Sequence, residues 1–239
     1  MKTLATLLIV NLLFLQIGFG QTFSSTEELF REYGISVEFL NEALFGNTQE
    51  NFSFKTTEVK SIKSPEALNP YFQTVEKQYL STTGEWKVLN KDNSDWNGFL
   101  DNEKVLMPHA IQFLKVENIS LLHEDAQSLT FKFHFQAKDL PKNQKHLKVF
   151  EGKIILSKAQ KSLDKIEVYA TSGFNTATVT RVRFFNAVQV YKKDLKTGLP
   201  LLQRETIKAE SGTFGKSVVL DKTIHYYDYK QDVQQQNEV

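Results

Sequence analysis

The sequence contains no cysteine among its 239 residues. This absence excludes disulfide bonds, a cysteine nucleophile and the acylated N-terminal cysteine of bacterial lipoproteins. The core must therefore supply all of the folding stability. An excess of one charge is lacking as well, because 29 lysines and arginines are balanced by 28 acidic residues. A neutral chain without a basic run offers no electrostatic footprint for nucleic acid or for an anionic membrane.

Long hydrophobic runs are confined to the N-terminus. Lys2 precedes an apolar run over residues 4–17, and Gly18-Phe19-Gly20 then places small residues just before Gln21. This pattern predicts a signal peptide at residues 1–20 that is cleaved before Gln21. The alternative is an uncleaved anchor helix, but the run is shorter than the ~20 residues of a membrane span. We therefore expect an exported protein, periplasmic or secreted, with no transmembrane anchor after cleavage.

The rest of the chain is rich in residues that favour strands. It has 19 Phe and 8 Tyr residues together with many Val, Ile and Thr. The expected fold class is mainly β with a few short α-helices (α+β). The expected organisation is a helical N-terminal segment at 21–50, an antiparallel β domain at 51–230 and a disordered tail at 231–239.

Two short helices are predicted near the new N-terminus. Ser25 and Glu28 form a capping-box pattern before an apolar stripe that ends at Gly34. Ser36 can cap a second short helix, with Gly46 past its end.

The next segment is harder to interpret. Phe52 and Phe54 alternate with polar neighbours and suggest a first strand. Asn69-Pro70 is typical of a helix start, and apolar residues keep a helical spacing to Leu80. We predict a helix there, with a strand as the alternative.

Period-two alternation is clearest in residues 128–138. One face carries Leu129, Phe131, Phe133 and Phe135, and the other carries Thr130, Lys132, His134 and Gln136. Successive extended runs with short polar turns predict an antiparallel meander, with a turn at Ser211-Gly212. The runs cover residues 116–123, 128–138, 149–157, 163–171, 177–192, 199–209 and 216–229. In the longest run, residues 177–192, we assign one face to Val182, Phe184, Val188 and Val190, and the other to Arg181, Arg183, Gln189 and Tyr191.

Motifs that carry chemistry are few. Residues 93–104 match an EF-hand loop at several positions, but Asn93 replaces the first Asp. Lys104 stands where the bidentate Glu is needed, so we interpret the segment as a polar loop and predict no metal. The histidines show neither HxxxH nor HExxH spacing, which argues against zinc; they are His109, His123, His134, His146 and His225.

No nucleophile elbow and no glycine-rich phosphate loop are present, so we expect neither an enzyme nor a cofactor. The alternative is a pair of dispersed carboxylates that the fold assembles, as in glycosidases.

Several features of residues 116–230 follow one another in a recognisable order. They are a hairpin with aromatic alternation over 118–138, the run Phe150–Lys158 with Gly152 near its start, Leu163-Asp164-Lys165-Ile166, the turn Gly198-Leu199-Pro200 and the ending Tyr226–Lys230. In this order they resemble the LolA-like superfamily of periplasmic carriers and its outer-membrane lipoprotein-sorting relatives. The resemblance covers about half of the mature chain.

The resemblance implies a meander curved into a half-barrel, closed on its concave side by short helices. That cavity binds acyl chains in the carriers. Candidates for the ligand-binding face here are Phe131, Phe133, Phe135, Ile154, Leu156, Ile166 and Val168. The alternative for all seven is ordinary core packing, because every half-buried sheet has such a face.

We therefore expect a periplasmic, non-enzymatic protein that binds an apolar or lipidic ligand, such as a lipid or an acyl chain. The alternative is an envelope accessory protein with a filled core and a protein partner. An enzyme with dispersed carboxylates is the third hypothesis.

Overall fold

The computed structural model describes residues 25–44, 52–64, 69–92, 114–175, 180–213 and 216–231. The predicted signal peptide, the EF-hand-like loop and the predicted tail beyond Gln231 lie outside these residues. Within them, the helices are α2 (Thr26–Glu32), α3 (Val37–Leu44) and the 3-10 helices η2 (Val116–Asn118) and η3 (Lys142–Val149). The strands are β1 (Phe52–Lys63), β2 (Tyr71–Leu80), β3 (Glu85–Lys91), β4 (Ile119–Glu124), β5 (Ser128–His134), β6 (Phe150–Ser157), β7 (Ser162–Ala170), β8 (Phe174–Asn175), β9 (Thr180–Lys193), β10 (Pro200–Thr213) and β11 (Lys216–Gln231). The prediction of a mainly β fold with a few short helices is confirmed.

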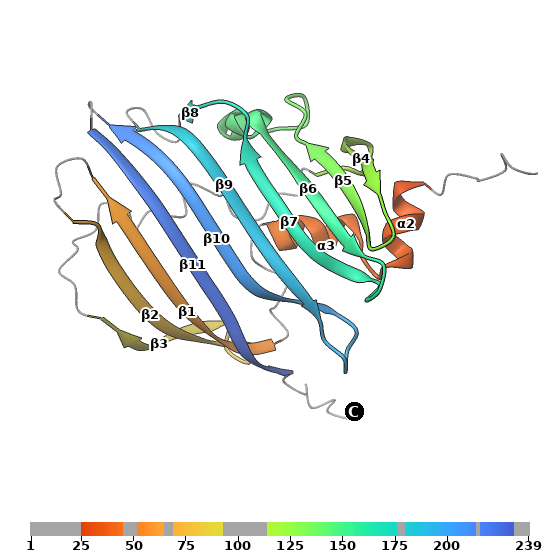
Figure 1. The fold of residues 1–239 in the computed structure, drawn as a ribbon, viewed down its shortest axis with the longest axis horizontal. Coiled ribbons are helices and arrows are strands. Elements are labelled where there is room, and N and C mark those ends of the chain that lie inside the picture. Colours follow the sequence, from red (N-terminus) through yellow and green to blue (C-terminus); the bar gives the residue numbers. More distant parts are fainter. Residues whose placement is uncertain are drawn as a thin grey trace, which may run out of the picture.

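All strands belong to one curved antiparallel sheet (Figure 1). Its order is β3-β2-β1-β11-β10-β9-β7-β6-β5-β4, with the short β8 paired to β9. The predicted meander is confirmed from β4 to β11. What the sequence pattern did not predict is that β1 pairs with β11, the last strand. This pairing places β3 and β4, although consecutive among the described strands, at opposite edges of the sheet.

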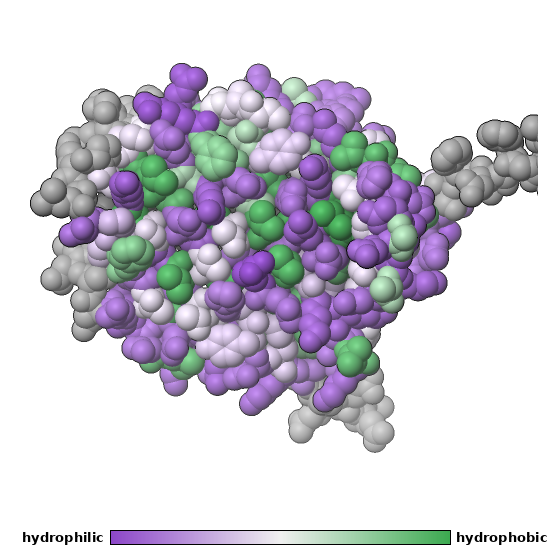
Figure 2. Space-filling view, viewed as in Figure 1, coloured by the Kyte–Doolittle hydropathy of each residue, from purple (hydrophilic) through white to green (hydrophobic). Residues whose placement is uncertain are grey.

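The N-terminal helices begin where their caps predict. Glu28 donates its backbone N–H to Ser25 Oγ at 3.2 Å, and its carboxylate accepts from Ser25 N at 2.8 Å. Phe39 N donates to Ser36 Oγ at 3.0 Å. Both helices lie against one face of the sheet (Figure 1), which we call the inner face. Figure 2 shows the opposite face, which is mostly hydrophilic with small separate hydrophobic spots.

The helix predicted after Asn69-Pro70 is wrong, because residues 71–80 form β2. β2 pairs with β1 and places Tyr71, Val75 and Tyr79 on the inner face. Gln73 and Lys77 lie between these three on that same face. Apolar residues therefore recur at every fourth position, which mimics the period of a helix.

The two faces predicted for residues 177–192 are also wrong in part. The backbone pairing of β9 with β10 skips Arg183, because Phe184 and Val182 pair with consecutive residues of β10. Such a bulge reverses the alternation of faces. Phe184 is 47% exposed, whereas Phe185 is fully buried. The buried residues of β9 are Val182, Phe185, Ala187, Gln189 and Tyr191. Val182 therefore shares its face with Gln189 and Tyr191, which we assigned to the other face, and not with Phe184, Val188 and Val190.

The turn predicted at Ser211-Gly212 is likewise wrong. β10 continues to Thr213, and Gly212 pairs with Ser217 of β11.

A buried amide fixes α3 to the chain that leads into β4. Asn41 Nδ2 donates to Leu114 O at 3.0 Å, and Leu114 N donates to Asn41 Oδ1 at 3.0 Å. Asn41→Ala should therefore lower the free energy of unfolding by about 2 kcal/mol, because two buried backbone groups lose their partner. Urea denaturation measures this loss, with Asn175→Ala at an exposed position as the matched control. Equal losses in the two variants would contradict the role assigned to Asn41.

Candidate functional site

The inner face is one continuous surface that changes character along the sheet. Directly paired residues of neighbouring strands point to the same face. One such row crosses from β1 to β5 through Glu58, Ile224, Glu205, Gln189, Ile166, Ile154 and Phe131. The row is charged or polar at one end and wholly apolar at the other. We call the two parts the polar half (β1, β2, β10 and β11) and the apolar half (β5, β6 and β7).

The apolar half contains all seven predicted ligand-binding residues. The structure brings Phe131, Phe133, Phe135, Ile154, Leu156, Ile166 and Val168 into one hydrophobic cluster, and none is more than 5% exposed. Side chains of the N-terminal helices cover them: Phe30 of α2 and Leu40 of α3 are buried in the same cluster. The Phe30 ring meets the Phe131 ring edge-on, with 4.8 Å between centroids.

The Phe133 ring explains why a glycine stands near the start of β6. Gly152 pairs with Phe133 across β5 and β6. A Cβ at this position would lie 2.3 Å from Phe133 Cζ and 2.4 Å from Glu167 O. The glycine therefore leaves the space that the Phe133 ring fills.

The polar half holds charged side chains where a core face is usual. Lys60 and Lys222 are directly paired across β1 and β11, and they are only 4% and 8% exposed. Glu58 lies beside them, with its carboxylate 3.6 Å from Lys222 Nζ and 3.3 Å from Lys77 Nζ. Like charges directly opposite each other destabilise a sheet. Glu58 thus pairs with Lys222 and Lys77 on the inner face of β1, β2 and β11.

A second network joins the polar half to β9. Gln189 Nε2 donates to Glu205 Oε1 at 3.1 Å, and Tyr191 Oη donates to Gln189 Oε1 at 3.0 Å. Tyr226 Oη lies 3.5 Å from the other oxygen of Glu205. Burial raises the pKa of the Tyr191 and Tyr226 phenols well above the ordinary value, although part of the Tyr226 ring is exposed. Both phenols therefore stay protonated and act as donors.

Aromatic rings close the polar half at one end of the strands. The Phe54 ring lies 5.3 Å from the rings of Tyr79 and Tyr229 and 5.5 Å from the ring of Trp86, between centroids. Half of the Trp86 side chain remains exposed at the edge strand β3. This end of the inner face offers stacking surfaces as well as charge.

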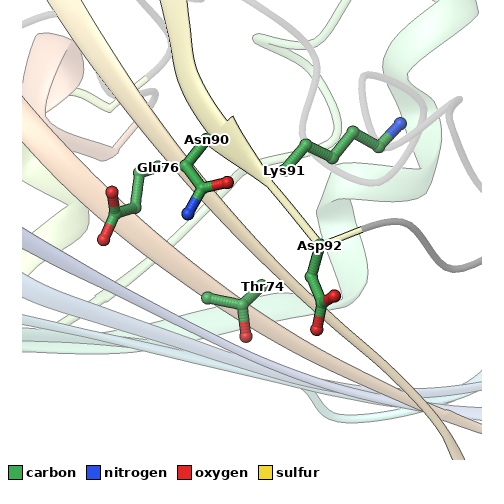
Figure 3. A pocket seen from close by; sticks show the side chains of 5 residues that line it. All are labelled: Thr74, Glu76, Asn90, Lys91 and Asp92. Atoms are coloured by element: carbon green, nitrogen blue, oxygen red, sulfur yellow. The ribbon is translucent and has the colours of Figure 1, made fainter.

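Two surface depressions lie away from the apolar half. One, of about 410 Å³, lies between β2 and β3 and is lined by Thr74, Glu76, Asn90, Lys91 and Asp92. In Figure 3 the Lys91 side chain points away from the other four. The second, of about 420 Å³, lies beside the β9–β10 hairpin. None of the seven predicted residues lines either depression.

The described residues contain no group of three or more His, Cys, Asp or Glu side chains that could hold a metal ion. Nor do they include a helix long and apolar enough to cross a membrane.

Sequence reasoning missed the polar half altogether. On β1 the inner positions are Phe54, Thr56, Glu58, Lys60 and Ile62. From the sequence, charged residues at the centre of this strand indicate a solvated surface, because Glu and Lys are almost never fully buried unless paired. The burial of this face could have been inferred from Phe54 and Ile62, the apolar residues at the two ends of the same alternating set.

No protein-family model matches the chain, and no curated protein matches it either. Three solved structures are similar to it over most of their length. A LolA superfamily protein from Nitrosomonas europaea is 11% identical with a TM-score of 0.36, over 88% of this chain and 95% of that chain. A DUF1329 family protein from Desulfovibrio piger is 10% identical with a TM-score of 0.35, over 89% and 96%. A domain described as an outer membrane lipoprotein-sorting protein, from Vibrio parahaemolyticus, is 14% identical with a TM-score of 0.32, over 87% and 96%.

The LolA-like resemblance of residues 116–230 stays a prediction from the sequence. At these identities and TM-scores the similarity does not carry a function over to this chain.

Proposed function

We propose that the protein is an exported, periplasmic, non-enzymatic binding protein that holds an anionic amphiphile against its inner face. The acyl chain of a fatty acid or lipid lies on the apolar half. The anionic group lies on the polar half, beside Lys60 and Lys222. In this proposal the seven predicted residues contact the acyl chain.

The observation that carries this proposal is the change of character along one continuous inner face. A single row of directly paired residues runs from Glu58 on β1 to Phe131 on β5. Lys60 and Lys222 are paired beside the charged end of this row, where their ammonium groups attract an anionic headgroup. The other end of the row is apolar and favours an acyl chain. One molecule can therefore contact both halves.

The shortness of α2 and α3 supports the proposal that they form a removable cover over the apolar half. α2 and α3 have 7 and 8 residues, fewer than the ~12–15 at which isolated helices become marginally stable. Their position therefore depends on contacts with the sheet, such as that of Phe30 with Phe131. We propose that a ligand displaces these contacts and takes their place.

A specific observation favours a second candidate function. All seven predicted residues are packed in one cluster at 0–5% exposure. This favours an envelope accessory protein whose core is filled and whose partner is another protein.

Titration with a fluorescent fatty-acid analogue distinguishes the two functions. We expect saturable binding, and weaker binding of the matching neutral fatty alcohol. Phe135→Gln should weaken binding more than it lowers the melting temperature, because the wall of a ligand site can be hydrated whereas a packed core cannot. Lys222→Met should reduce the preference for the acid, and Lys87→Gln on the exposed strand β3 serves as the control.

A filled core predicts the reverse result. The folded wild type would then show no saturable binding, and Phe135→Gln would mainly lower the melting temperature.

A further inference from the structure

The tip of the β9–β10 hairpin carries an apolar side chain that is almost wholly exposed in the described part of the chain. Leu195 is 95% exposed, the highest value for a large hydrophobic residue in the described chain. Leu199, at the other end of the turn, is 44% exposed. In Figure 1 the hairpin projects at the lower right of the sheet, and Figure 2 shows a hydrophobic patch at the same place.

The turn does not need Leu195 to hold its shape. Asp194 Oδ2 accepts from Thr197 N at 2.9 Å and from Thr197 Oγ1 at 2.7 Å. Gly198 has a φ of 75°, which glycine adopts without strain. Its N–H donates to Asp194 O at 2.8 Å, so the loop closes through these three residues. The turn thus presents Leu195 on a rigid support.

Lysines surround the apolar tip. The lining of the depression of about 420 Å³ beside the hairpin includes Leu195, the lysines Lys192, Lys193 and Lys196, and the acids Asp194 and Asp228. Its two acids are engaged elsewhere. Asp194 closes the turn, and Asp228 pairs with Lys55 Nζ at 2.9 Å. Lys193 donates to Gln160 O at 3.1 Å, whereas Lys192 and Lys196 are exposed.

We propose that this hairpin tip docks on a membrane surface that contains anionic phospholipids. Leu195 enters the acyl region, and the ammonium groups of Lys192 and Lys196 contact phosphate headgroups. Tyr227 lies at the interface, where an aromatic ring with a polar end is favoured. The neutral composition predicted no footprint for an anionic membrane. That prediction concerns the whole chain, and the fold gathers these lysines at one exposed end.

The proposal is tested by co-sedimentation of the exported protein with lipid vesicles. One set contains phosphatidylcholine alone, and the other contains phosphatidylcholine mixed with phosphatidylglycerol. We expect binding to the mixed vesicles that weakens as salt is raised. Leu195→Asp should weaken it by roughly tenfold or more, the factor that corresponds to losing one buried Leu side chain. Lys192→Gln combined with Lys196→Gln should remove the preference for phosphatidylglycerol.

Two controls make the result specific. Leu122→Asp replaces a leucine that is 55% exposed on the edge strand β4, and it should leave vesicle binding unchanged. Soluble glycerol phosphate in excess should not displace the protein, because the apolar contact is absent from that ligand. All variants have the same N-terminus and differ only at the substituted positions, so any difference in vesicle binding comes from those side chains. Leu195→Asp should also leave the fatty-acid titration unchanged, which separates this proposal from the proposed function.

Equal binding by the wild type and Leu195→Asp would overturn the proposal. So would an equal loss in Leu122→Asp, or full displacement by glycerol phosphate.

Discussion

Replacing Phe133 with alanine is expected to lower the free energy of unfolding by about 3–5 kcal/mol, the usual cost of a large-to-small core substitution. Phe133 is fully buried, and its ring fills the space above Gly152. The ring also packs edge-on against Phe135, with 5.9 Å between centroids. Truncation leaves a cavity that the surrounding sheet cannot close, because the glycine beside it has no side chain to move in.

The matched control is Thr130→Ala on the other face of the same strand. Thr130 is partly exposed, and its replacement should change the free energy of unfolding by no more than about 0.5 kcal/mol. Urea denaturation of the two variants measures the difference. Equal losses would mean that the two faces of β5 are wrongly assigned.

Glu58→Leu should destabilise the protein by about 3–5 kcal/mol, because it removes the carboxylate beside the buried Lys222 ammonium. The Glu58 and Lys222 side chains are only 11% and 9% exposed, so solvent can replace little of the lost interaction. The double variant Glu58→Leu with Lys222→Met should recover most of this loss. Replacing a buried ion pair by apolar residues of similar volume is often neutral or stabilising.

The double variant also separates stability from function. It should unfold near the urea concentration of the wild type, yet bind the fluorescent fatty acid no better than the neutral alcohol. Lys77→Met is the control, because Lys77 is more exposed and its loss leaves Glu58 with Lys222. If the double variant still prefers the fatty acid to the alcohol, the polar half does not bind the anionic group.

The sequence predicted the parts of the fold that rest on local chemistry. The capping residues Ser25 and Ser36 placed the starts of α2 and α3, and the alternation from Leu129 to Phe135 placed the buried face of β5. These signals are short-range, so one segment carries each of them. The seven residues of the apolar half were therefore grouped correctly as one buried face. Whether they bind a ligand stays a proposal.

What the sequence did not reveal depends on long-range pairing. β1 and β11 are more than 150 residues apart, and only their pairing makes Lys60 and Lys222 neighbours. The faces of β9 were misassigned because a bulge at Arg183 shifts the register by one residue. β2 was mistaken for a helix because polar residues on its inner face erase the period of two. In β9 an extra residue, and in β2 polar residues on the inner face, hide the strand pattern that local reasoning needs.

Lipid analysis of the protein expressed in a bacterial periplasm tests most directly whether the inner face binds an anionic amphiphile. Mass spectrometry of an organic extract should find fatty acids or anionic lipids in stoichiometric amounts with the wild type. Much smaller amounts should accompany the double variant of Glu58 and Lys222. A folded wild-type protein that carries no lipid, and binds none when it is supplied, would contradict the account.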